Sequence, residues 1–345
     1  TGSIYLHCDP AASHYLKVLM DSIFGPMNFR NEITWQRTNV HNDAKRWGTV
    51  ADTILYYGRS QDVVWNPPLV PHTEAYLASK YTHDDDDGRG VYRLDNMTSQ
   101  NPRPNMMYEW KGHASPPYGW RYSKETMAKL DAERRVWYPA SPARRPQLKR
   151  YLNEMSGSAM NSIWTDIPPI NSQAKERLGY ATQKPLALLE RIINVSSNPG
   201  DIVLDPFCGC GTAVHAAHKL CRKWIGIDIT HLAIGLIRRR MEDAFPVLKG
   251  KIRVVGEPVD LTGAMELAAK APYQFQWWAL DRVGAQPAGG DRKKGMDRGI
   301  DGIIPFIEGS TDRLRVIVFV KAGKLTPAFV RDLKGVLDRE GEPIG

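Results

Sequence analysis

A glycine-rich segment between two apolar runs constrains this chain more than any other feature. Residues 202–204 have the composition of a buried strand, and residues 212–220 have the apolar spacing of a helix. The segment between them reads Asp-Pro-Phe-Cys-Gly-Cys-Gly, with glycines at 209 and 211. Glycines in such a turn let backbone amides approach a ligand closely, and the N-terminus of the following helix offers further N–H donors. This pattern predicts a ligand-binding turn between a strand and a helix.

A second strand follows the helix and ends in a carboxylate. Residues 224–227 are the expected strand, and Asp228 stands at its end. In doubly wound sheets an acid in this place accepts hydrogen bonds from ribose hydroxyls. Strands that alternate with helices predict a parallel sheet that is covered on both faces. A dinucleotide-binding turn would need a third glycine where this chain has Val214, and Asp205 at the strand end suits a cationic part of a ligand.

Similar elements surround an irregular middle region. Further strands are expected at residues 3–7, 31–37 and 53–57, and further helices at residues 11–23, 186–196 and 231–245. From about residue 60 to 170, prolines, tryptophans and charges crowd together and the periodicity fades. We therefore expect a first part at 1–60, an insertion at 61–170, a ligand-binding half at 171–262 and a separate small unit at 270–345.

Charge and cysteine content limit the partners and the cellular compartment that suit the chain. The formal net charge is +8 over 345 residues, with a pI of about 9.2, which suits a polyanionic partner because Lys and Arg release phosphate counterions. The four cysteines have no disulfide-scaffold spacing, and no apolar run is long enough to span a membrane. We expect a cytoplasmic protein without a membrane partner.

The glycine turn and the segment before it resemble one enzyme family. Residues 205–212, preceded by Gly-Tyr-Ala-Thr-Gln-Lys-Pro at 179–185, are similar to the cofactor half of β-class DNA amino-methyltransferases. The resemblance implies a Rossmann-like sheet that binds S-adenosylmethionine. It also implies a set of cofactor-binding residues: Lys184, Pro185, Asp205, Pro206, Phe207, Gly209, Gly211, Thr212 and Asp228. Within that set, Asp228 would take the ribose, and Asp205 with Phe207 and the glycines would line the methionine side.

Members of that family transfer methyl to an exocyclic amine through an Asp/Asn/Ser-Pro-Pro-aromatic loop. Side-chain and backbone oxygens accept the amine hydrogens and restore its lone pair, while the aromatic ring stacks on a flipped base. Residues 3–17 resemble the strand and helix that follow this loop, so we expect the loop N-terminal to Thr1. In the family the strand of that loop lies between the cofactor strand and the one at residues 3–7, so we expect the sheet to lack a central strand. The only formal internal match is Ser115, Pro116, Pro117 and Tyr118, which follows no apolar strand and is better interpreted as a turn.

The irregular region carries the residues expected to read DNA. Basic and amide side chains interleave with aromatic ones, a composition that suits phosphate contact and base-edge readout. The candidate contacts are Arg103, Trp110, Arg121, Arg134, Arg135, Arg144 and Arg145. An ordinary loop domain is the alternative. The acidic run at 84–87 is interpreted as a hydrated loop, with cation chelation as its alternative.

The C-terminal unit resembles the Mrr-type branch of PD-(D/E)xK nucleases. The matching residues are Asp301 and Lys321, the latter at the end of an expected strand at 315–321, with Asp297 nearby. In such nucleases carboxylates hold Mg²⁺, so Asp301 is a candidate metal ligand. Phe319 occupies the position of the expected second acid, and Gln276 stands where an upstream helix often has Glu. A non-cleaving DNA-binding or regulatory unit is therefore favoured over an active nuclease.

Three hypotheses follow. The preferred one is a site-specific methyltransferase that acts on adenine N6 or cytosine N4 of double-stranded DNA, as a monomer or a homodimer. The second is a catalytically silent module that binds cofactor and DNA. The third is a restriction nuclease whose methyltransferase-like part provides specificity.

Overall fold

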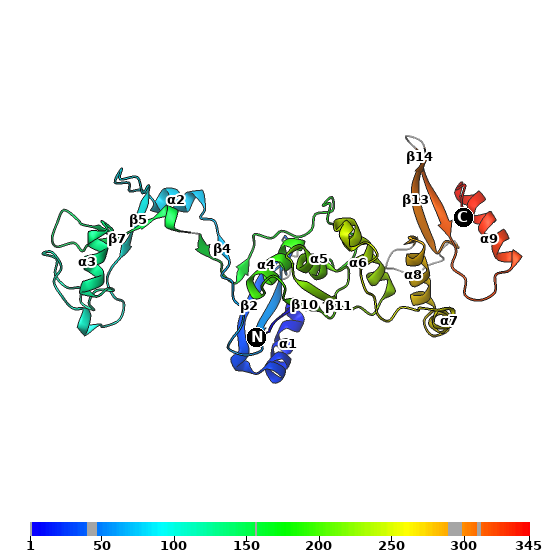
Figure 1. The fold of residues 1–345 in the computed structure, drawn as a ribbon, viewed down its shortest axis with the longest axis horizontal. Helices are drawn as coiled ribbons and strands as arrows, with labels where there is room; N and C mark the ends of the chain where they lie inside the picture. Colours follow the sequence, from blue (N-terminus) through cyan, green and yellow to red (C-terminus); the bar gives the residue numbers. More distant parts are fainter. Residues whose placement is uncertain (1, 40–46, 156, 289–298, 309–311) are drawn as a thin grey trace. The chain divides into compact units, whose positions relative to one another are not determined.

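The computed structural model describes residues 2–39, 47–155, 157–288, 299–308 and 312–345, which form two compact units (Figure 1). Unit 1 comprises Thr1–Asn66 and Ser162–Gly345, and unit 2 comprises Pro67–Asn161. Unit 2 falls within the region expected as an insertion. Among the described residues, no helix is both long and apolar enough to cross a membrane.

The first part of unit 1 is a four-stranded sheet in the order β1-β3-β2-β9. Its strands are β1 (Ser3–Cys8), β2 (Phe29–Gln36), β3 (Ala51–Gly58) and β9 (Ile163–Trp164), and only the β2–β9 pair is parallel. Helix α1 (Pro10–Phe24) begins at Asp9, whose carboxylate accepts the Ala12 N–H at 2.9 Å. The helix packs on the sheet through Met20, which lies with Leu55 and Tyr57 in one apolar cluster.

The second part of unit 1 alternates helices with two parallel strands. The elements are α4 (Leu186–Ser196), β10 (Ile202–Asp205), α5 (Thr212–Lys219), β11 (Lys223–Gly226) and α6 (His231–Ala244). β10 and β11 pair with Asp205 opposite Gly226, so both strands end at the same edge. Helices α4 and α5 lie together beside this pair (Figure 1) and share a core with Val203 and Trp224.

The expectation of one parallel sheet covered on both faces is wrong for the described residues. Their strands form separate sheets in unit 1, and only β10 and β11 make a parallel pair flanked by helices. The side chains of Ile202, Leu204, Ile225 and Ile227 alternate onto the other face of that pair, where each is more than half exposed. The periodicity of each element was recognisable, but the sheet to which a strand belongs depends on contacts between distant residues.

Unit 2 has its own core around a three-stranded antiparallel sheet, β5-β7-β6. The strands are β5 (Tyr92–Asn96), β6 (Val136–Trp137) and β7 (Gln147–Tyr151), and the helices are α2 (Glu74–Lys80) and α3 (Lys124–Ala132). A short pair joins β4 (Leu69–Val70) to β8 (Ser158–Ala159). The core consists of Met97, Trp110, Trp120, Met127, Val136 and Leu148. The tryptophans of this irregular region therefore build a hydrophobic core.

The C-terminal segment contains α7 (Leu261–Lys270), α8 (Pro272–Arg282), a β12-β13-β14 sheet and α9 (Pro327–Glu340). The strands are β12 (Gln286–Pro287), β13 (Gly302–Glu308) and β14 (Asp312–Val318). Asp281 of α8 pairs with Arg238 at 2.9 Å and with Arg239 at 3.3 Å, both on α6. β14 ends three residues before Lys321, so the expectation of a strand that ends in this lysine is wrong. Short 3₁₀ helices occur at Pro26–Asn28, Pro104–Met106, Leu152–Glu154 and Pro246–Leu248.

Candidate functional site

The glycine turn lies directly against the end of strand β11. The Ile227 N–H donates to the Asp205 carbonyl at 2.9 Å, and the Cys208 N–H donates to the Ile227 carbonyl at 3.0 Å. The carboxylate of Asp228 then accepts the Gly209 N–H on Oδ2 at 3.0 Å. The two parts of the predicted ligand site, the turn that begins at Asp205 and the acid at 228, are therefore in contact.

The hydrogen bonds of Asp228 leave one oxygen only partly used. Its Oδ1 accepts both the N–H and the hydroxyl of Thr230, at 2.9 and 2.8 Å, whereas Oδ2 accepts only the Gly209 N–H. Because a carboxylate oxygen accepts about two hydrogen bonds, Oδ2 keeps room for one more donor. This geometry is compatible with a ligand hydroxyl at the end of β11.

The carboxyl of Asp205 has no countercharge. Burial raises its pKa above the ordinary value of 3.8, and the nearby charge of Asp228 raises it further, while a hydrogen bond from the Phe207 N–H at 3.2 Å opposes both. No ion pair joins Asp205 to a basic side chain in the part of the chain that the structure describes. A cationic ligand group beside Asp205 would offset both the cost of burying the charged carboxylate and its repulsion from Asp228.

The two glycines meet different constraints. Gly209 has φ of +48°, and a Cβ there would lie 3.1 Å from a ring carbon of Tyr180. Gly211 has φ of +73°, and a Cβ there would lie 2.7 Å from Cγ1 of Ile237 on α6. Gly209 thus keeps the turn open beneath a tyrosine ring, and Gly211 lets helix α6 pack closely. Tyr180 was not identified from the sequence, although it lies in the segment that carries the resemblance.

Two apolar side chains project from this site into solvent. Phe207, a predicted cofactor residue in the turn, is 86% exposed, and Ile229, directly after Asp228, is 93% exposed. Pro206 beside Phe207 is exposed as well. Exposed apolar side chains next to two acids are suited to cover the planar parts of a ligand. Ile229 was missed because it reads as the continuation of an apolar strand.

Thr212 does not reach the site through its side chain. It is only 5% exposed, and its hydroxyl accepts a hydrogen bond from the buried guanidinium of Arg240 at 3.1 Å. Arg240 also donates to the Cys210 carbonyl at 3.1 Å, and burial lowers its pKa. Thr212 was predicted to bind a cofactor, but its hydroxyl is engaged by Arg240. Thr212 instead helps Arg240 brace the turn from behind.

Lys184 lies in a charged cluster that includes the end of β1. Its ammonium donates to the Thr182 carbonyl at 3.0 Å, and burial lowers its pKa, with Asp52 opposing and Arg37 adding to the shift. Asp52 is buried, accepts His7 Nε2 at 2.8 Å and lies 3.3 Å from Arg37 Nε. Burial and the charge of Lys184 lower the pKa of His7 below 6.5. His7 therefore has a structural partner. The charges of Asp52 and Cys210 both act on Lys184, and Pro185 directly precedes α4.

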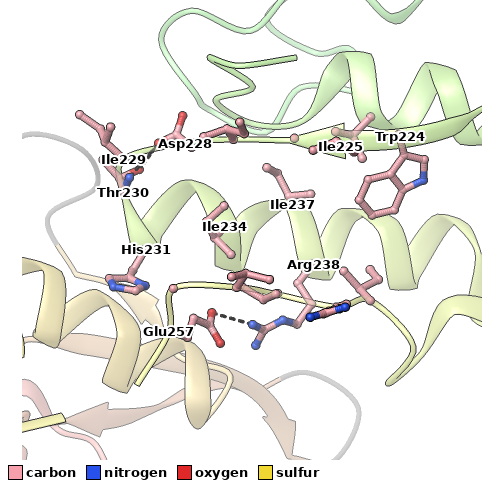
Figure 2. A pocket seen from close by; sticks show the side chains of 18 residues that line it. Trp224, Ile225, Asp228, Ile229, Thr230, His231, Ile234, Ile237, Arg238 and Glu257 are labelled. Atoms are coloured by element: carbon pink, nitrogen blue, oxygen red, sulfur yellow. Dashed lines mark hydrogen bonds and ion pairs between the residues drawn. The ribbon is translucent and has the colours of Figure 1, made fainter. Parts of the chain in front are cut away.

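A cavity of about 460 Å³ adjoins the site on another side of β11 (Figure 2). Trp224, Ile234 and Ile237 form apolar walls, and the Arg238–Glu257 ion pair at 2.7 Å lies at its edge. The cavity reaches Asp228 and Ile229, whose side chains lie at one end of it in Figure 2. Asp205, Gly209 and Gly211 do not line it. The hydrogen bonds of the turn therefore locate the candidate site better than the cavity does.

The predicted DNA contacts differ in their availability. Trp110 is 8% exposed, and its indole N–H donates to the Tyr138 hydroxyl at 2.9 Å, so its prediction as a surface contact does not fit. Arg135 is paired with Glu154 and Glu133. Arg121 lies 3.6 Å from Asp95, and Arg103 donates to the Arg121 carbonyl at 3.2 Å. The exposed members are Arg103, Arg134, Arg144 and Arg145.

The formal catalytic match in unit 2 is a turn. The Gly119 N–H donates to the Pro116 carbonyl at 2.9 Å, and the Ser115 hydroxyl donates to the same carbonyl at 3.1 Å. Tyr118 is 52% exposed, and its carbonyl accepts the Arg103 N–H. No strand leads directly into Ser115, Pro116, Pro117 and Tyr118. This geometry agrees with their interpretation as a turn.

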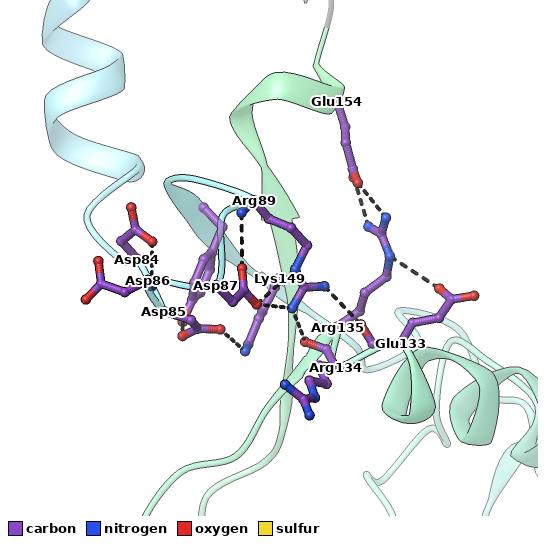
Figure 3. A network of polar contacts seen from close by, with 11 residues as sticks. Asp84, Asp85, Asp86, Asp87, Arg89, Glu133, Arg134, Arg135, Lys149 and Glu154 are labelled. Carbon is purple, nitrogen blue, oxygen red and sulfur yellow. Dashed lines mark hydrogen bonds and ion pairs between the residues drawn. The ribbon is translucent and has the colours of Figure 1, made fainter.

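Two of the four acids in the run at 84–87, Asp85 and Asp87, are paired with basic side chains (Figure 3). Asp85 contacts Lys149 and the Tyr92 hydroxyl, and Arg89 contacts Asp87 at 2.5 Å. These contacts lower the pKa of Asp85, and that of Asp87 to about 2. Among the described residues there is no group of three or more metal-ligating side chains. Asp85 and Asp87 are thus held by the protein's own cations, which favours the loop interpretation over chelation.

The C-terminal residues of the nuclease resemblance converge at the start of β13. Asp301 contacts the Gln276 amide through one oxygen, accepts the Val320 N–H at 2.8 Å through the other, and lies 3.9 Å from Lys321. Asp297 lies outside the described residues. With Phe319 in place of the second acid, Asp301 is the one carboxylate that the described part of this corner supplies. The residues present do not fit a Mg²⁺ site.

Comparisons with known proteins identify the family of this chain. The sequence profile of the DNA methylase family matches residues 1–238. The type II methyltransferase M.EcaI of Enterobacter cloacae is 34% identical over 242 residues, which cover 69% of this chain and 53% of that protein. The DNA adenine methyltransferase YhdJ of Escherichia coli is 47% identical over 83 residues, which cover 24% of this chain and 28% of that protein. The chain thus spans only about half the length of the curated relatives it matches, or less.

A solved structure, the M1.HpyAVI complex with S-adenosylmethionine, aligns with 70% of this chain and 74% of its own, at 18% identity and a TM-score of 0.36. That superposition is too loose to support an argument about the site. The family profile covers well over half of the sequence and includes β1, the glycine turn and Asp228. The chain therefore belongs to the DNA methylase family.

Proposed function

We propose that this chain is the main part of a DNA amino-methyltransferase that uses S-adenosylmethionine and acts on an exocyclic amine of a flipped base, adenine N6 or cytosine N4. The observation that carries the proposal is the contact between the glycine turn and Asp228, next to an Asp205 carboxyl without a countercharge. An NAD-type ligand would bring negative charge to this turn. A sulfonium ligand instead brings a positive charge, which can act as the counterion of the Asp205 carboxylate.

The residues of the turn fit this cofactor in separate ways. Bound S-adenosylmethionine supplies a methyl group activated by a sulfonium cation. Asp205 stabilises that cation, and Asp228 Oδ2 accepts a ribose hydroxyl in addition to the Gly209 N–H. Phe207, on the methionine side, and Ile229 would cover apolar parts of the cofactor. Lys184 and Pro185 would lie beside it. Gly211 keeps α6 close enough for Arg240 to hold the turn.

The target side of the reaction is less complete in the described residues. A Pro-Pro-aromatic loop that accepts the amine hydrogens stays a prediction. Unit 2, with its exposed arginines, is proposed to contact duplex DNA. Association of two copies of the chain also stays a prediction.

Two measurements separate the methyltransferase from a silent binding module. Calorimetric titration with S-adenosylmethionine should show binding by the native chain and loss of binding in Asp228→Ala. Asp243→Ala, which removes an exposed acid from α6, is the matched control and should bind normally. Transfer of tritiated methyl to mixed-sequence duplex DNA then distinguishes an enzyme from a module that binds cofactor without catalysis. Unchanged cofactor affinity in Asp228→Ala would refute the assignment of the site.

A second candidate role concerns the C-terminal segment. The convergence of Gln276, Asp301 and Lys321 supports descent from a nuclease-like unit. Because the corner does not fit a metal ion, we propose that this segment binds DNA or modulates its binding without cleavage. Incubation of supercoiled plasmid with the chain and Mg²⁺ should leave it intact, and nicking that Asp301→Ala abolishes would instead favour a nuclease.

A further inference from the structure

The sheet of unit 2 carries two arginines that face one another across neighbouring strands. Arg93 on β5 is directly opposite Arg150 on β7 in the antiparallel register. Side chains opposite one another in such a pair share a face and lie about 5 Å apart at Cβ, and like charges in this position are destabilising. The chain therefore maintains an unfavourable arrangement at this point.

One carboxylate serves the whole cluster. Asp95 Oδ2 lies 3.3 Å from Arg150 Nε and 3.6 Å from Arg121 Nη1, while its Oδ1 lies 3.9 Å from Arg93 and accepts the Asn96 N–H at 3.1 Å. Three guanidinium groups thus share a single negative charge, and Arg103 adjoins them through its bond to the Arg121 carbonyl. The cluster of Arg93, Arg121 and Arg150 around Asp95 has a net charge of +2.

The contacts within this cluster are incomplete. The Nε of Arg93 is buried and has no hydrogen-bond partner among the residues that the structure describes. The side chains of Arg93, Arg121 and Arg150 remain 26%, 38% and 40% exposed, so an anion from solvent can reach them. An unpaired buried donor costs about 1–3 kcal/mol, and a bound anion would supply its acceptor.

The neighbouring residue on β7 has a different environment. Lys149 points to the opposite face of the sheet, where Asp85 neutralises it and its side chain is 11% exposed. On the same side of the molecule as that pair, Arg135 has close contacts with Glu154 and a second pair with Glu133 (Figure 3). The cluster of Arg93, Arg121 and Arg150 thus keeps a cationic excess, whereas Lys149 and Arg135 are neutralised by carboxylates.

We propose that the Arg93, Arg121 and Arg150 cluster is a binding site for backbone phosphates of duplex DNA. The inference rests on the proposed function, in which the chain acts on DNA. A phosphate group placed between Arg93 and Arg150 relieves their repulsion and accepts the Arg93 Nε–H. Guanidinium forks match phosphate oxygens bidentately. Such contacts orient unit 2 on the duplex and carry no sequence information themselves.

The test measures how DNA affinity depends on salt. Anisotropy of a fluorescein-labelled duplex of mixed sequence is recorded with the full chain at several salt concentrations, for wild type, Arg150→Gln, Arg93→Gln/Arg150→Gln and Arg135→Gln. Each lost phosphate contact lowers the magnitude of the slope of log K against log salt by about 0.9. The expected result is one such decrease for Arg150→Gln, about twice that for the double variant, and none for the Arg135→Gln control.

Two further variants test the cluster in the opposite direction. Asp95→Asn removes the competing carboxylate and should tighten DNA binding and steepen the slope. Arg150→Lys keeps the charge and should keep the slope. Thermal melting checks folding: because Arg150→Gln relieves a like-charge contact, it should not lower the melting temperature, whereas a purely structural Arg150 would.

The outcomes separate the inference from the proposed function. If wild type binds the duplex but Arg150→Gln keeps the wild-type slope, or loses no more than Arg135→Gln, the phosphate site is refuted and DNA action stands. If Arg150→Gln melts markedly earlier with an unchanged slope, the cluster is structural. If wild type does not bind duplex DNA at any salt concentration, both the site and the proposed DNA action are refuted.

Discussion

Asp205 and Asp301 each adjoin a strand end in unit 1, and the chain treats their carboxyls in opposite ways. Asp301 contacts an amide side chain, a backbone N–H and a lysine, so the protein itself satisfies it. Asp205 has one backbone N–H at 3.2 Å, a second carboxylate nearby and a raised pKa. An acid that the fold leaves unsatisfied indicates where a ligand belongs, whereas a satisfied acid indicates a structural corner. The difference favours the methyltransferase site over the nuclease-like one.

The largest effect is expected where the support of the Asp205 turn is removed. Arg240→Ala leaves the Cys210 carbonyl and the Thr212 hydroxyl without their buried donor, which should lower the free energy of unfolding by about 2–3 kcal/mol. Chemical denaturation measures it. Arg239→Ala, which removes a more exposed neighbour, is the control and should change stability by less than about 1 kcal/mol. Equal losses in both variants would mean that Arg240 does not brace the turn.

The second prediction separates binding from stability at Asp205 itself. Asp205→Asn should weaken S-adenosylmethionine binding roughly tenfold to a hundredfold, because a charge-assisted contact worth about 1.5–3 kcal/mol is lost. The same change removes a desolvated charge that faces Asp228, so the ligand-free protein should unfold at a higher temperature. Calorimetry and thermal melting measure the two effects. If Asp205→Asn were less stable and bound the cofactor normally, Asp205 would be the structural acid and not the ligand-binding one.

At Asp301, which contacts Gln276, Val320 and Lys321, we expect the opposite pattern: substitution should lower stability and leave cofactor affinity unchanged. Asp301→Ala leaves the Val320 N–H and the Gln276 amide without their acceptor and should cost about 1–2 kcal/mol of stability. Cofactor affinity should not change, and Mg²⁺ should not raise the melting temperature of the native chain above that in a salt control of equal ionic strength. A specific Mg²⁺ effect that Asp301→Ala removes would place Asp301 with Asp205 among the ligand-binding acids.

The smallest expected effect is a pH dependence. Since the pKa of Asp205 is raised, the stability that its protonated form contributes is complete below 3.8 and is lost as pH rises through the folded-state pKa. On acidification from neutral pH towards this range, the ligand-free wild type should gain stability relative to Asp205→Asn, while its cofactor affinity falls. Parallel melting and titration series measure both. If the difference between the two proteins did not change with pH, the Asp205 carboxyl would be as well solvated as an ordinary one.

Local signals in the sequence predicted the cofactor half closely. Helix α4 was expected at 186–196 and occupies Leu186–Ser196, and β10 and α5 each differ from their expected bounds by one residue. The contact between the turn and Asp228 was predictable too, because parallel neighbouring strands bring their carboxyl ends to one edge. Apolar periodicity and the glycines determine these features within a few residues of chain.

Features that depend on distant residues were not predictable. The burial of Trp110 and the use of Thr212 by Arg240 both involve partners 28 residues away in the chain. Trp110 was interpreted as a DNA contact because aromatic side chains interleave with basic and amide ones in this region, and composition does not reveal that Tyr138 accepts its indole N–H. The Arg93, Arg121 and Arg150 cluster was not predictable either, because it depends on the strand register that places Arg93 opposite Arg150.

The packing of Gly211 against Ile237 also has a genetic consequence. Every missense change of one base in a glycine codon produces a residue with a Cβ, and here that atom would lie 2.7 Å from the isoleucine side chain in a left-handed backbone conformation. Every single-base missense change at this codon is therefore expected to destabilise the protein. In a saturation screen, codon 211 should tolerate only synonymous changes, while a compensating loss of bulk at codon 237 could restore only the space and not the backbone conformation.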